Sequence, residues 1–420
     1  MIQSSASILP RSHLLSYARQ SISDTDIAAV RSVLESDFLT CGPKVAEFEC
    51  AFAAKVGAQY AVAVNSATSA LHLAMRVADI GPGDRVITSP ITFLASANCA
   101  AYVGATPDFA DIDPVSYNLD AGALKRTWKS DTRAVVAVDY AGQPCEMPAI
   151  AKIARENGAL LIEDACHGTG GGFFHDGKVW KLGGHPWADM AVFSFHPAKA
   201  LTSGEGGMLV TDNGQWAERA RVLRTHGMVR ESTQFVGLAD QSGASSSDLI
   251  PALEERGPWY YEMQDLGYNY RITDLQCALG LSQLGRLDDF VARRREIVAS
   301  YNRSFATLQF LKTPQLSIFN SPDLISWHLY TLQIDFPAIG KTRTQVMSGL
   351  RNKGVGTQVL YIPIYLQPWY RRTYGYRAGK CPVAEDFYSR ALSLPLFPSM
   401  SDDDVCKVVR EVSALARDLG

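Results

Sequence analysis

The chain has 420 residues, of which 47% are hydrophobic, so it is long enough for a large domain and a smaller one. Lys and Arg total 40 against 43 Asp and Glu, and this balance, a formal net charge of −3, argues against nucleic acid as a partner. No run approaches the roughly 18 apolar residues of a membrane span, and the N-terminus lacks the pattern of a signal peptide. We therefore expect a cytoplasmic protein that binds neither membrane nor nucleic acid.

Short β-branched apolar runs alternate with helical patterns between about Gln59 and Asp212. The predicted strands cover residues 60–64, 85–88, 107–112, 134–139, 159–163, 190–195 and 207–211. This alternation indicates a mostly parallel sheet covered by helices on both faces. In such sheets ligands collect at the carboxyl ends of the strands. We expect the residues that carry the function to lie there.

A long segment without a regular pattern follows, at residues 229–259, and segments of this length are often lids or disordered. The sequence then predicts a long helix over 272–294 that continues to residue 303. The C-terminal part mixes predicted strands and helices. These are strands at 329–336 and 356–359, and helices at 343–353, 384–391 and 402–415.

We divide the chain into three parts on this pattern. Residues 1–25 are an N-terminal segment that joins the small domain, residues 26–285 are the large domain, and residues 286–420 are a smaller C-terminal α+β domain.

Two predicted strand ends carry side chains that could take part in catalysis. Glu163 and Asp164 follow an apolar strand, and the carboxylate of Asp164 could cap a helix, bind a metal or face a cationic ring nitrogen. Lys199 follows another strand within a turn of small residues. A lysine at such a place is either a solvated charge or an amine that forms a Schiff base with an aldehyde.

Two further strand ends predict binding groups. Ser66 to Thr68 open a helix, where free N–H groups suit a phosphate, although an ordinary helix cap has the same pattern. Phe93 follows the next strand and would either stack on a flat heterocycle or lie in the core. Together with Asp164 and Lys199, these groups match pyridoxal 5'-phosphate (PLP), which has a phosphate, an aromatic face, a ring nitrogen and an aldehyde. No His, Cys and Asp spacing resembles a metal-ligand set, so we expect no metal.

Three ordered motifs resemble those of the DegT-type sugar aminotransferases, a fold-type I family that depends on PLP. They are DACH at 164–167, SFHPAK at 194–199 and DLGYNYRITDLQCALG at 265–280. The resemblance implies an α/β fold of type I, in which a large domain has a mostly parallel mixed sheet flanked by helices. A smaller α+β C-terminal domain would complete it.

The resemblance also implies a role for individual residues. Lys199 would be the catalytic residue that holds the cofactor, and Asp164 would pair with the pyridinium nitrogen. His167 would lie near the ring hydroxyl, and Phe93 would stack on the ring. The residues implied to contact the cofactor phosphate are Ala67, Thr68, Ser194 and, from the neighbouring subunit, Asn269. A homodimer with composite active sites follows from that last assignment.

Within the family, stretches such as NSATSALHL at 65–73 and VAVDYAGQP at 136–144 resemble the transaminases of pseudaminic acid biosynthesis. That resemblance implies transfer of the amino group of L-glutamate to the C4 ketone of UDP-2-acetamido-2,6-dideoxy-4-keto-L-hexose. The product would be UDP-4-amino-4,6-dideoxy-N-acetyl-β-L-altrosamine. The residues implied to line the substrate pocket are Tyr17, Phe38, Leu39, Thr40, Ala67, Ser194, Asn269, Tyr361 and Tyr365.

Other functions stay open at this point. The nearest alternative is an aminotransferase for another keto sugar, linked to dTDP or to UDP in the D-configuration. A PLP-dependent sugar dehydratase and a non-catalytic binding protein of the same fold are further alternatives. Lys199 argues against both, because some dehydratase relatives replace the lysine and a binding protein would not need it.

Overall fold

The computed structural model describes residues 14–236 and 257–415. Its centre is a seven-stranded sheet in the order β1-β9-β8-β5-β4-β2-β3. Strand β9 is antiparallel to both of its neighbours, and the other neighbouring pairs are parallel. The strands are β1 (Tyr60–Val64), β2 (Arg85–Thr88), β3 (Thr106–Phe109), β4 (Thr132–Val138), β5 (Leu160–Asp164), β8 (Met190–Ser194) and β9 (Gly207–Thr211). The prediction of a mostly parallel mixed sheet is confirmed, and each predicted strand is present with ends shifted by three residues at most.

Helices cover both faces of this sheet because alternate strand residues point to opposite sides. Ala61 and Ala63 of β1 pack against one set of helices, whereas Val62 and Val64 pack against the other. The first set is α2 (Pro43–Val56), α5 (Ala121–Thr127), α6 (Met147–Glu156) and α8 (Asp274–Leu284). The second set is α3 (Ala67–Val77), α4 (Ala95–Tyr102) and α7 (Gly214–Arg224).

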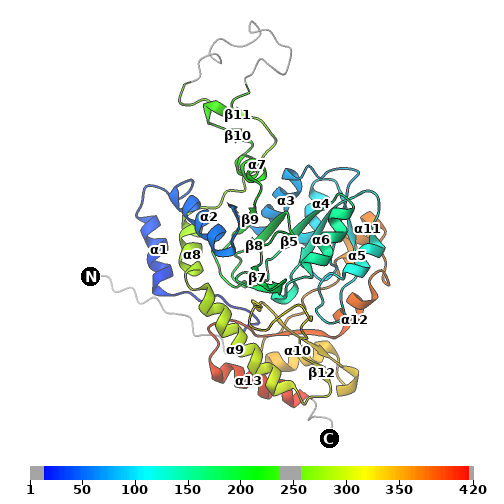
Figure 1. Ribbon diagram of the computed structural model, residues 1–420. Coiled ribbons are helices and arrows are strands. Elements are labelled where there is room, and N and C mark those ends of the chain that lie inside the picture. The colour runs from blue at the N-terminus through cyan, green and yellow to red at the C-terminus, as the bar shows by residue number, and fades with distance from the viewer. Residues whose placement is uncertain (1–13, 237–256, 416–420) are drawn as a thin grey trace, which may run out of the picture.

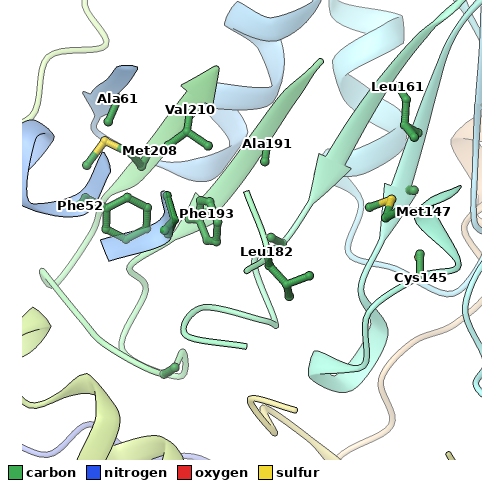
Figure 2. Packing of buried hydrophobic residues seen from close by; sticks show 14 of the residues in the cluster. Phe52, Ala61, Cys145, Met147, Leu161, Leu182, Ala191, Phe193, Met208 and Val210 are labelled. Atoms are coloured by element: carbon green, nitrogen blue, oxygen red, sulfur yellow. The ribbon is translucent and has the colours of Figure 1, made fainter. Parts of the chain in front are cut away.

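Aromatic side chains fill the first of these interfaces. Figure 2 shows Phe52 of α2 beside Phe193 of β8, and their ring centroids lie 4.9 Å apart. Phe52 also packs edge-on against Phe195, which follows β8 at the start of the turn that carries Lys199. Each buried aromatic ring of this size contributes roughly 1.5–3 kcal/mol to the free energy of unfolding. This packing therefore fixes the strand from which the Lys199 turn departs.

A three-stranded antiparallel sheet, β12-β13-β14, forms the second core. Its strands are β12 (Leu311–Lys312), β13 (Tyr330–Ile334) and β14 (Ala391–Leu394). The helices around it are α10 (Arg343–Asn352), α12 (Pro382–Arg390) and α13 (Asp402–Ser413), and α11 (Pro368–Tyr374) lies beside the large sheet (Figure 1). The strand predicted at 356–359 is wrong. Residues 356–359 make one isolated bridge, between Gln358 and Ser393 of β14. Strand β14, which was not predicted, pairs with β13.

The long helix predicted over 272–303 is also wrong, because two helices replace it. Helix α8 ends at Leu284, and α9 (Leu287–Phe305) begins after Gly285 and Arg286. The first turns of α9 pack under the large sheet through Leu287 and Val291, whereas its second half packs on the small sheet. A single helix therefore joins the two cores, and the domain boundary at 285/286 stays a prediction.

The N-terminal segment runs along the small core before helix α1 (Asp24–Leu34) begins. Leu15 exchanges backbone hydrogen bonds with Gly354 and Gly356, and the Tyr17 carbonyl accepts from Leu396. The predicted boundary at 25/26 falls within the first turn of α1, and residues 1–13 and 416–420 of the predicted parts lie outside the described residues.

Two antiparallel pairs lie outside the main sheets. The strands β6 (Gly172–His175) and β7 (Lys178–Lys181) form a hairpin. The strands β10 (Met228–Val229) and β11 (Glu262–Met263) pair in an arm that extends from the body beyond α7 (Figure 1). Residues 229–236 and 257–259 of the segment predicted at 229–259 lie in this arm, and residues 237–256 lie outside the described residues.

Candidate functional site

A cavity of about 480 Å³ opens at the carboxyl ends of the parallel strands. Nine of the residues that the sequence assigned to a site line it. They are Tyr17, Ala67, Thr68, Phe93, Asp164, His167, Ser194, Lys199 and Tyr361. These residues come from four strand ends with the turns or helix starts that follow them, from the N-terminal segment and from the segment after α10. The fold therefore brings together groups that are far apart in the chain.

Lys199 lies in the turn that follows β8. Its backbone N–H donates to the His196 carbonyl at 2.8 Å, which closes the turn. Desolvation by the surrounding protein lowers the pKa of the Lys199 amine, and nearby Cys166 and Asp164 oppose that shift. A lowered pKa leaves a larger fraction of the amine uncharged, and the uncharged amine is the form that attacks an aldehyde or accepts a proton.

Asp164 is the last residue of β5, and it is 4% exposed. Its Oδ2 accepts a hydrogen bond of 2.6 Å from the Ser96 hydroxyl, and its Oδ1 accepts from the Cys166 N–H at 3.2 Å. Ser96 has one hydroxyl proton, which it gives to Asp164, so the Thr92 hydroxyl donates to Ser96 over 2.8 Å. This chain of donors orients a carboxylate at the cavity wall, where it would stabilise a cationic ring nitrogen.

His167 lies three residues after Asp164 in the sequence, and the tautomer of its ring follows from its hydrogen-bond partners. The Ala141 N–H donates to Nδ1 at 3.2 Å, so Nδ1 is an acceptor. Burial, together with the Lys199 charge, holds the pKa of His167 well below its usual range, so the ring is neutral. The proton is therefore on Nε2, which donates to the Tyr361 hydroxyl at 3.1 Å.

Tyr361 completes this pair from the segment after α10. Burial raises the pKa of its hydroxyl, so the hydroxyl keeps its proton. Because it accepts from His167, its own proton is available to an acceptor in the cavity. The Tyr361 ring lies 6.3 Å from the Phe93 ring, measured between centroids. Phe93 is 56% exposed and presents an aromatic face on which a flat ligand could stack.

The start of α3 provides the anion-binding part of the cavity. The Ser66 hydroxyl caps the helix by accepting from the Ser69 N–H at 3.2 Å. By helix geometry the N–H groups of Ala67 and Thr68 have no acceptor within the helix, and the helix dipole makes this end positive. Gly207 of β9 lies so close that a Cβ there would meet the Ala67 nitrogen at 2.4 Å. A glycine is needed at that point of β9 to let the helix start approach the sheet.

Five assigned residues do not line the cavity. Phe38, Leu39, Thr40 and Asn269 are exposed, and Asn269 is paired with Thr225 near the base of the arm. Tyr365 is fully buried. Its hydroxyl donates to Glu385, and its ring lies 5.8 Å from that of Phe109. The packing of the segment Ile364–Leu366 against β3 turns this side chain into the core.

Some cavity residues had no role in the sequence assignment. Ser96 and Thr92 follow the same strand as Phe93, and their spacing of four residues was the available signal. His328 lies with its ring centroid 4.4 Å from that of His167. Glu205 also lines the cavity.

The described residues contain neither a metal-binding group nor a membrane-spanning helix. Within residues 14–236 and 257–415, no three His, Cys, Asp or Glu side chains are grouped so that they could hold a metal ion. None of the helices in the same ranges is both long enough and apolar enough for a transmembrane span.

Comparison with known proteins gives one family. The sequence profile of the DegT/DnrJ/EryC1/StrS aminotransferase family matches residues 20–413. The spore coat polysaccharide biosynthesis protein SpsC of Bacillus subtilis is 41% identical over 408 residues, which are 97% of this chain and 98% of SpsC.

Solved structures agree with that match. Helicobacter pylori PseC, an aminotransferase involved in the biosynthesis of pseudoaminic acid, superposes with a TM-score of 0.83 at 29% identity, over 97% of this chain and 100% of PseC. S. venezuelae DesV, solved in complex with a ketimine intermediate, superposes with a TM-score of 0.79 at 30% identity, over 94% of this chain and 95% of DesV.

Proposed function

Because this chain belongs to the DegT/DnrJ/EryC1/StrS aminotransferase family, we propose that it moves the amino group of L-glutamate to the C4 ketone of a UDP-linked keto sugar. The sugar of this proposal is 2-acetamido-2,6-dideoxy-4-keto-L-hexose, and the product is UDP-4-amino-4,6-dideoxy-N-acetyl-β-L-altrosamine. The chain is a PLP-dependent sugar aminotransferase of fold type I by its family and by its structural relatives. The donor, the nucleotide and the sugar are the proposed part.

One observation carries the assignment of the site. A single cavity contains a desolvated lysine, a carboxylate held by a serine, an exposed aromatic ring and a helix start. These groups fit the aldehyde, the ring nitrogen, the ring face and the phosphate of PLP. We therefore assign Lys199, Asp164, Phe93 and the backbone of Ala67 and Thr68 to the cofactor, with Ser194 beside the phosphate.

PLP, when bound, supplies an aldehyde that accepts the amino group and a ring that stabilises the charge left by proton removal. In the donor half-reaction Lys199 Nζ would remove the proton from the donor's α-carbon, and in the separate sugar half-reaction it would deliver a proton to C4 of the sugar. Asp164 would hold the protonated ring nitrogen, and the Ser96 hydroxyl keeps Asp164 in place. The Tyr361 hydroxyl, oriented by neutral His167, would donate a hydrogen bond to a group bound in the cavity. Asp164, Ser96 and His167 are buried, so water has little access to these three side chains.

The likeness to PseC supports the proposed sugar. PseC acts in pseudoaminic acid biosynthesis, and the two chains superpose over nearly their full lengths. Tyr17 and Tyr361 place two phenol groups at the cavity, where they would contact the hexose or its acetamido group. The exposed residues Phe38, Leu39 and Thr40 would contact the nucleotide.

A second candidate is an aminotransferase for a different nucleotide-linked keto sugar. The specific observation in its favour is the 41% identity to SpsC, a protein of spore coat polysaccharide biosynthesis, which exceeds the 29% identity to PseC. The dehydratase and the non-catalytic binding protein are no longer alternatives, because the chain belongs to an aminotransferase family and superposes on solved aminotransferases such as PseC.

We also propose a homodimer with composite active sites. The exposed position of Asn269, outside its own cavity, supports this, since the asparagine would then be free to reach the phosphate in a partner's cavity. Large apolar side chains are exposed on the same chain, among them Phe38 (52% exposed) and Leu266 (66% exposed). Exposed apolar side chains of this size often mark an interface between subunits.

Product analysis with a panel of keto sugars tests the substrate. The purified enzyme, loaded with PLP and given glutamate, would be offered the UDP-linked 4-keto-L-hexose, a UDP-linked 4-keto-D-hexose and a dTDP-linked keto sugar. We expect the L-sugar to give the highest kcat/KM and a 4-amino product of the altro configuration by NMR. A higher kcat/KM with a dTDP or D-configured sugar would replace the proposed substrate by the second candidate.

A further inference from the structure

Arg294 is a buried guanidinium without a carboxylate partner. It lies on α9, its side chain is 0% exposed, and it forms no ion pair with any residue of 14–236 or 257–415. Burial lowers the pKa of Arg294 to about 10, so it still carries a charge at neutral pH. Burying an unpaired charge is costly unless other groups solvate it. Other groups must therefore stabilise the charge of Arg294.

Backbone carbonyl groups solvate the two terminal nitrogens of the guanidinium, whereas Nε has no hydrogen-bond partner among the described residues. Nη1 donates to the Leu396 carbonyl at 2.8 Å and lies 3.4 and 3.5 Å from the carbonyls of Trp327 and His328. Nη2 donates to the carbonyl of Lys199 at 3.4 Å. The planar fork of arginine has donors in several fixed directions, so one side chain can bridge three separate segments.

The contact to Lys199 fixes the backbone of that residue from a second side. The Lys199 N–H is held within its own turn by His196, and the Lys199 carbonyl accepts from Arg294 on α9. The same guanidinium holds the backbone of His328, whose ring lines the cavity next to His167. Helix α9 connects the large sheet to the small one, so Arg294 ties the lysine turn to the small core (Figure 1).

We propose that Arg294 is a positioning residue that sets where the Lys199 amine lies in the cavity. This inference rests on the proposed role of Lys199 as the residue that links to the cofactor. It predicts that loss of Arg294 disturbs reactions of the Lys199 amine more than it disturbs contacts that other residues make with the cofactor.

The neighbouring arginines provide matched controls. Arg293 forms ion pairs with Asp402 and Glu296, and Arg295 donates to the Ile325 carbonyl at 2.8 Å. Neither contacts the Lys199 turn through these bonds. Arg295→Met removes the same kind of group from the same helix and leaves the bond to Lys199 in place.

The test compares two cofactor forms on the full-length protein freed of cofactor. Pyridoxal phosphate condenses with the Lys199 amine, with loss of water, whereas pyridoxamine phosphate has no aldehyde and binds through the ring and phosphate alone. Binding of both forms would be measured for the wild type, Arg294→Met and Arg295→Met. For Arg294→Met we expect pyridoxal phosphate to bind about tenfold or more weakly, since small misplacements of a reacting group are costly. Pyridoxamine phosphate should change by about twofold at most, and Arg295→Met should leave both affinities near wild type.

Each other outcome has a defined meaning. Equal weakening of both forms in Arg294→Met would show a general structural role and overturn the inference, as would no weakening at all. Arg294→Lys keeps the charge but has a single nitrogen to donate hydrogen bonds. We therefore expect a smaller loss of affinity, confined to pyridoxal phosphate. This variant decides the question if Arg294→Met does not fold. A wild type that forms no link through Lys199 would overturn the proposed function itself, whereas an intact wild-type link that Arg294→Met leaves unchanged would overturn this inference alone.

Discussion

The carboxylate of Asp164 shows how much of a cofactor site depends on residues that do not face the ligand. Ser96 donates to it at 2.6 Å from α4, and Thr92 donates in turn to Ser96. A hydrogen bond to a charged group contributes about 1.5–3 kcal/mol. The position of Asp164 therefore depends on a segment about 70 residues earlier in the chain.

Ser96→Ala tests this dependence. The substitution removes the donor to Asp164 without adding bulk, so we expect the affinity for PLP and kcat to fall roughly tenfold each. Equilibrium dialysis of the cofactor and steady-state kinetics would measure the two effects. Thr92→Val serves as the control, because it leaves the Ser96 donor in place and should have a smaller effect. Equal losses in both variants would contradict the direct role of Ser96.

Helix α3 contains a buried histidine that gives the stability a pH dependence. Burial, with a smaller effect of Arg76, lowers the pKa of His72 to about 4. The unfolded chain binds a proton at His72 below about pH 6.5, whereas the folded chain does not until about pH 4. The contribution of His72 to the free energy of unfolding is therefore present above pH 6.5 and is lost as the pH falls towards 4.

His72→Phe should reduce this loss. Between pH 6.5 and 4 we expect the free energy of unfolding of the variant to fall less steeply than that of the wild type, by up to about 1.4 kcal/mol per pH unit. Urea denaturation at several pH values would give both slopes. Parallel slopes for the two proteins would show that His72 does not titrate as described.

The close contact between Gly207 of β9 and the start of α3 can be tested in the same way. A methyl group at Gly207 would displace the Ala67 N–H, so Gly207→Ala should weaken phosphate binding roughly tenfold or more. Pyridoxamine phosphate affinity measures this without involving Lys199.

Gly349→Ala in α10 is the control, since no atom lies within 4 Å of its added Cβ, and it should stabilise the protein by about 0.5–1 kcal/mol. A normal affinity in Gly207→Ala would contradict the assignment of this helix start to the phosphate.

The elements differ in how far the sequence determines them. The strands of the large sheet are predictable because most are short, buried, mainly apolar runs bounded by turn residues, as in β1 and β8. The break between α8 and α9 is not, since Leu287 and Val291 continue the apolar pattern and only packing redirects the chain. Strand β14 was missed because Ala391–Leu394 is short and directly follows α12.

The candidate site likewise contains residues that the sequence predicts and residues whose position depends on tertiary packing. Lys199 and Asp164 stand at predictable strand ends within specific motifs, so the sequence alone predicts them as site residues, and both line the cavity. The spacing of Thr92 and Ser96 pairs their hydroxyls but does not show that they face Asp164, and the guanidinium behind Lys199 has no local signal, because both reach the site through contacts between distant segments. The position of Tyr365 depends on how its segment packs against Phe109, which its local sequence does not show.

At the scale of the whole molecule, the proposed composite site can be tested by mixing two inactive variants. If Asn269 acts in the partner's cavity, a heterodimer of Lys199→Ala and Asn269→Ala contains one site that has both defects and one that has neither. We expect each variant alone to lose most of its activity, and the heterodimer, isolated with two affinity tags, to regain up to about half of the wild-type activity because one of its two sites is intact. A heterodimer that is no more active than the two homodimers would show that Asn269 does not complete a partner's site.

The central claim is that the cavity around Lys199 performs transamination of a sugar in two half-reactions. The most direct measurement follows the absorbance of the PLP-loaded enzyme as glutamate is added alone, and again when the UDP-linked 4-keto sugar is added. We predict conversion of the cofactor to its amine form by glutamate and its return with the sugar, and loss of both changes in Lys199→Ala. A cofactor spectrum that does not respond to glutamate or to any other amino donor, in enzyme shown to contain PLP, would contradict the claim.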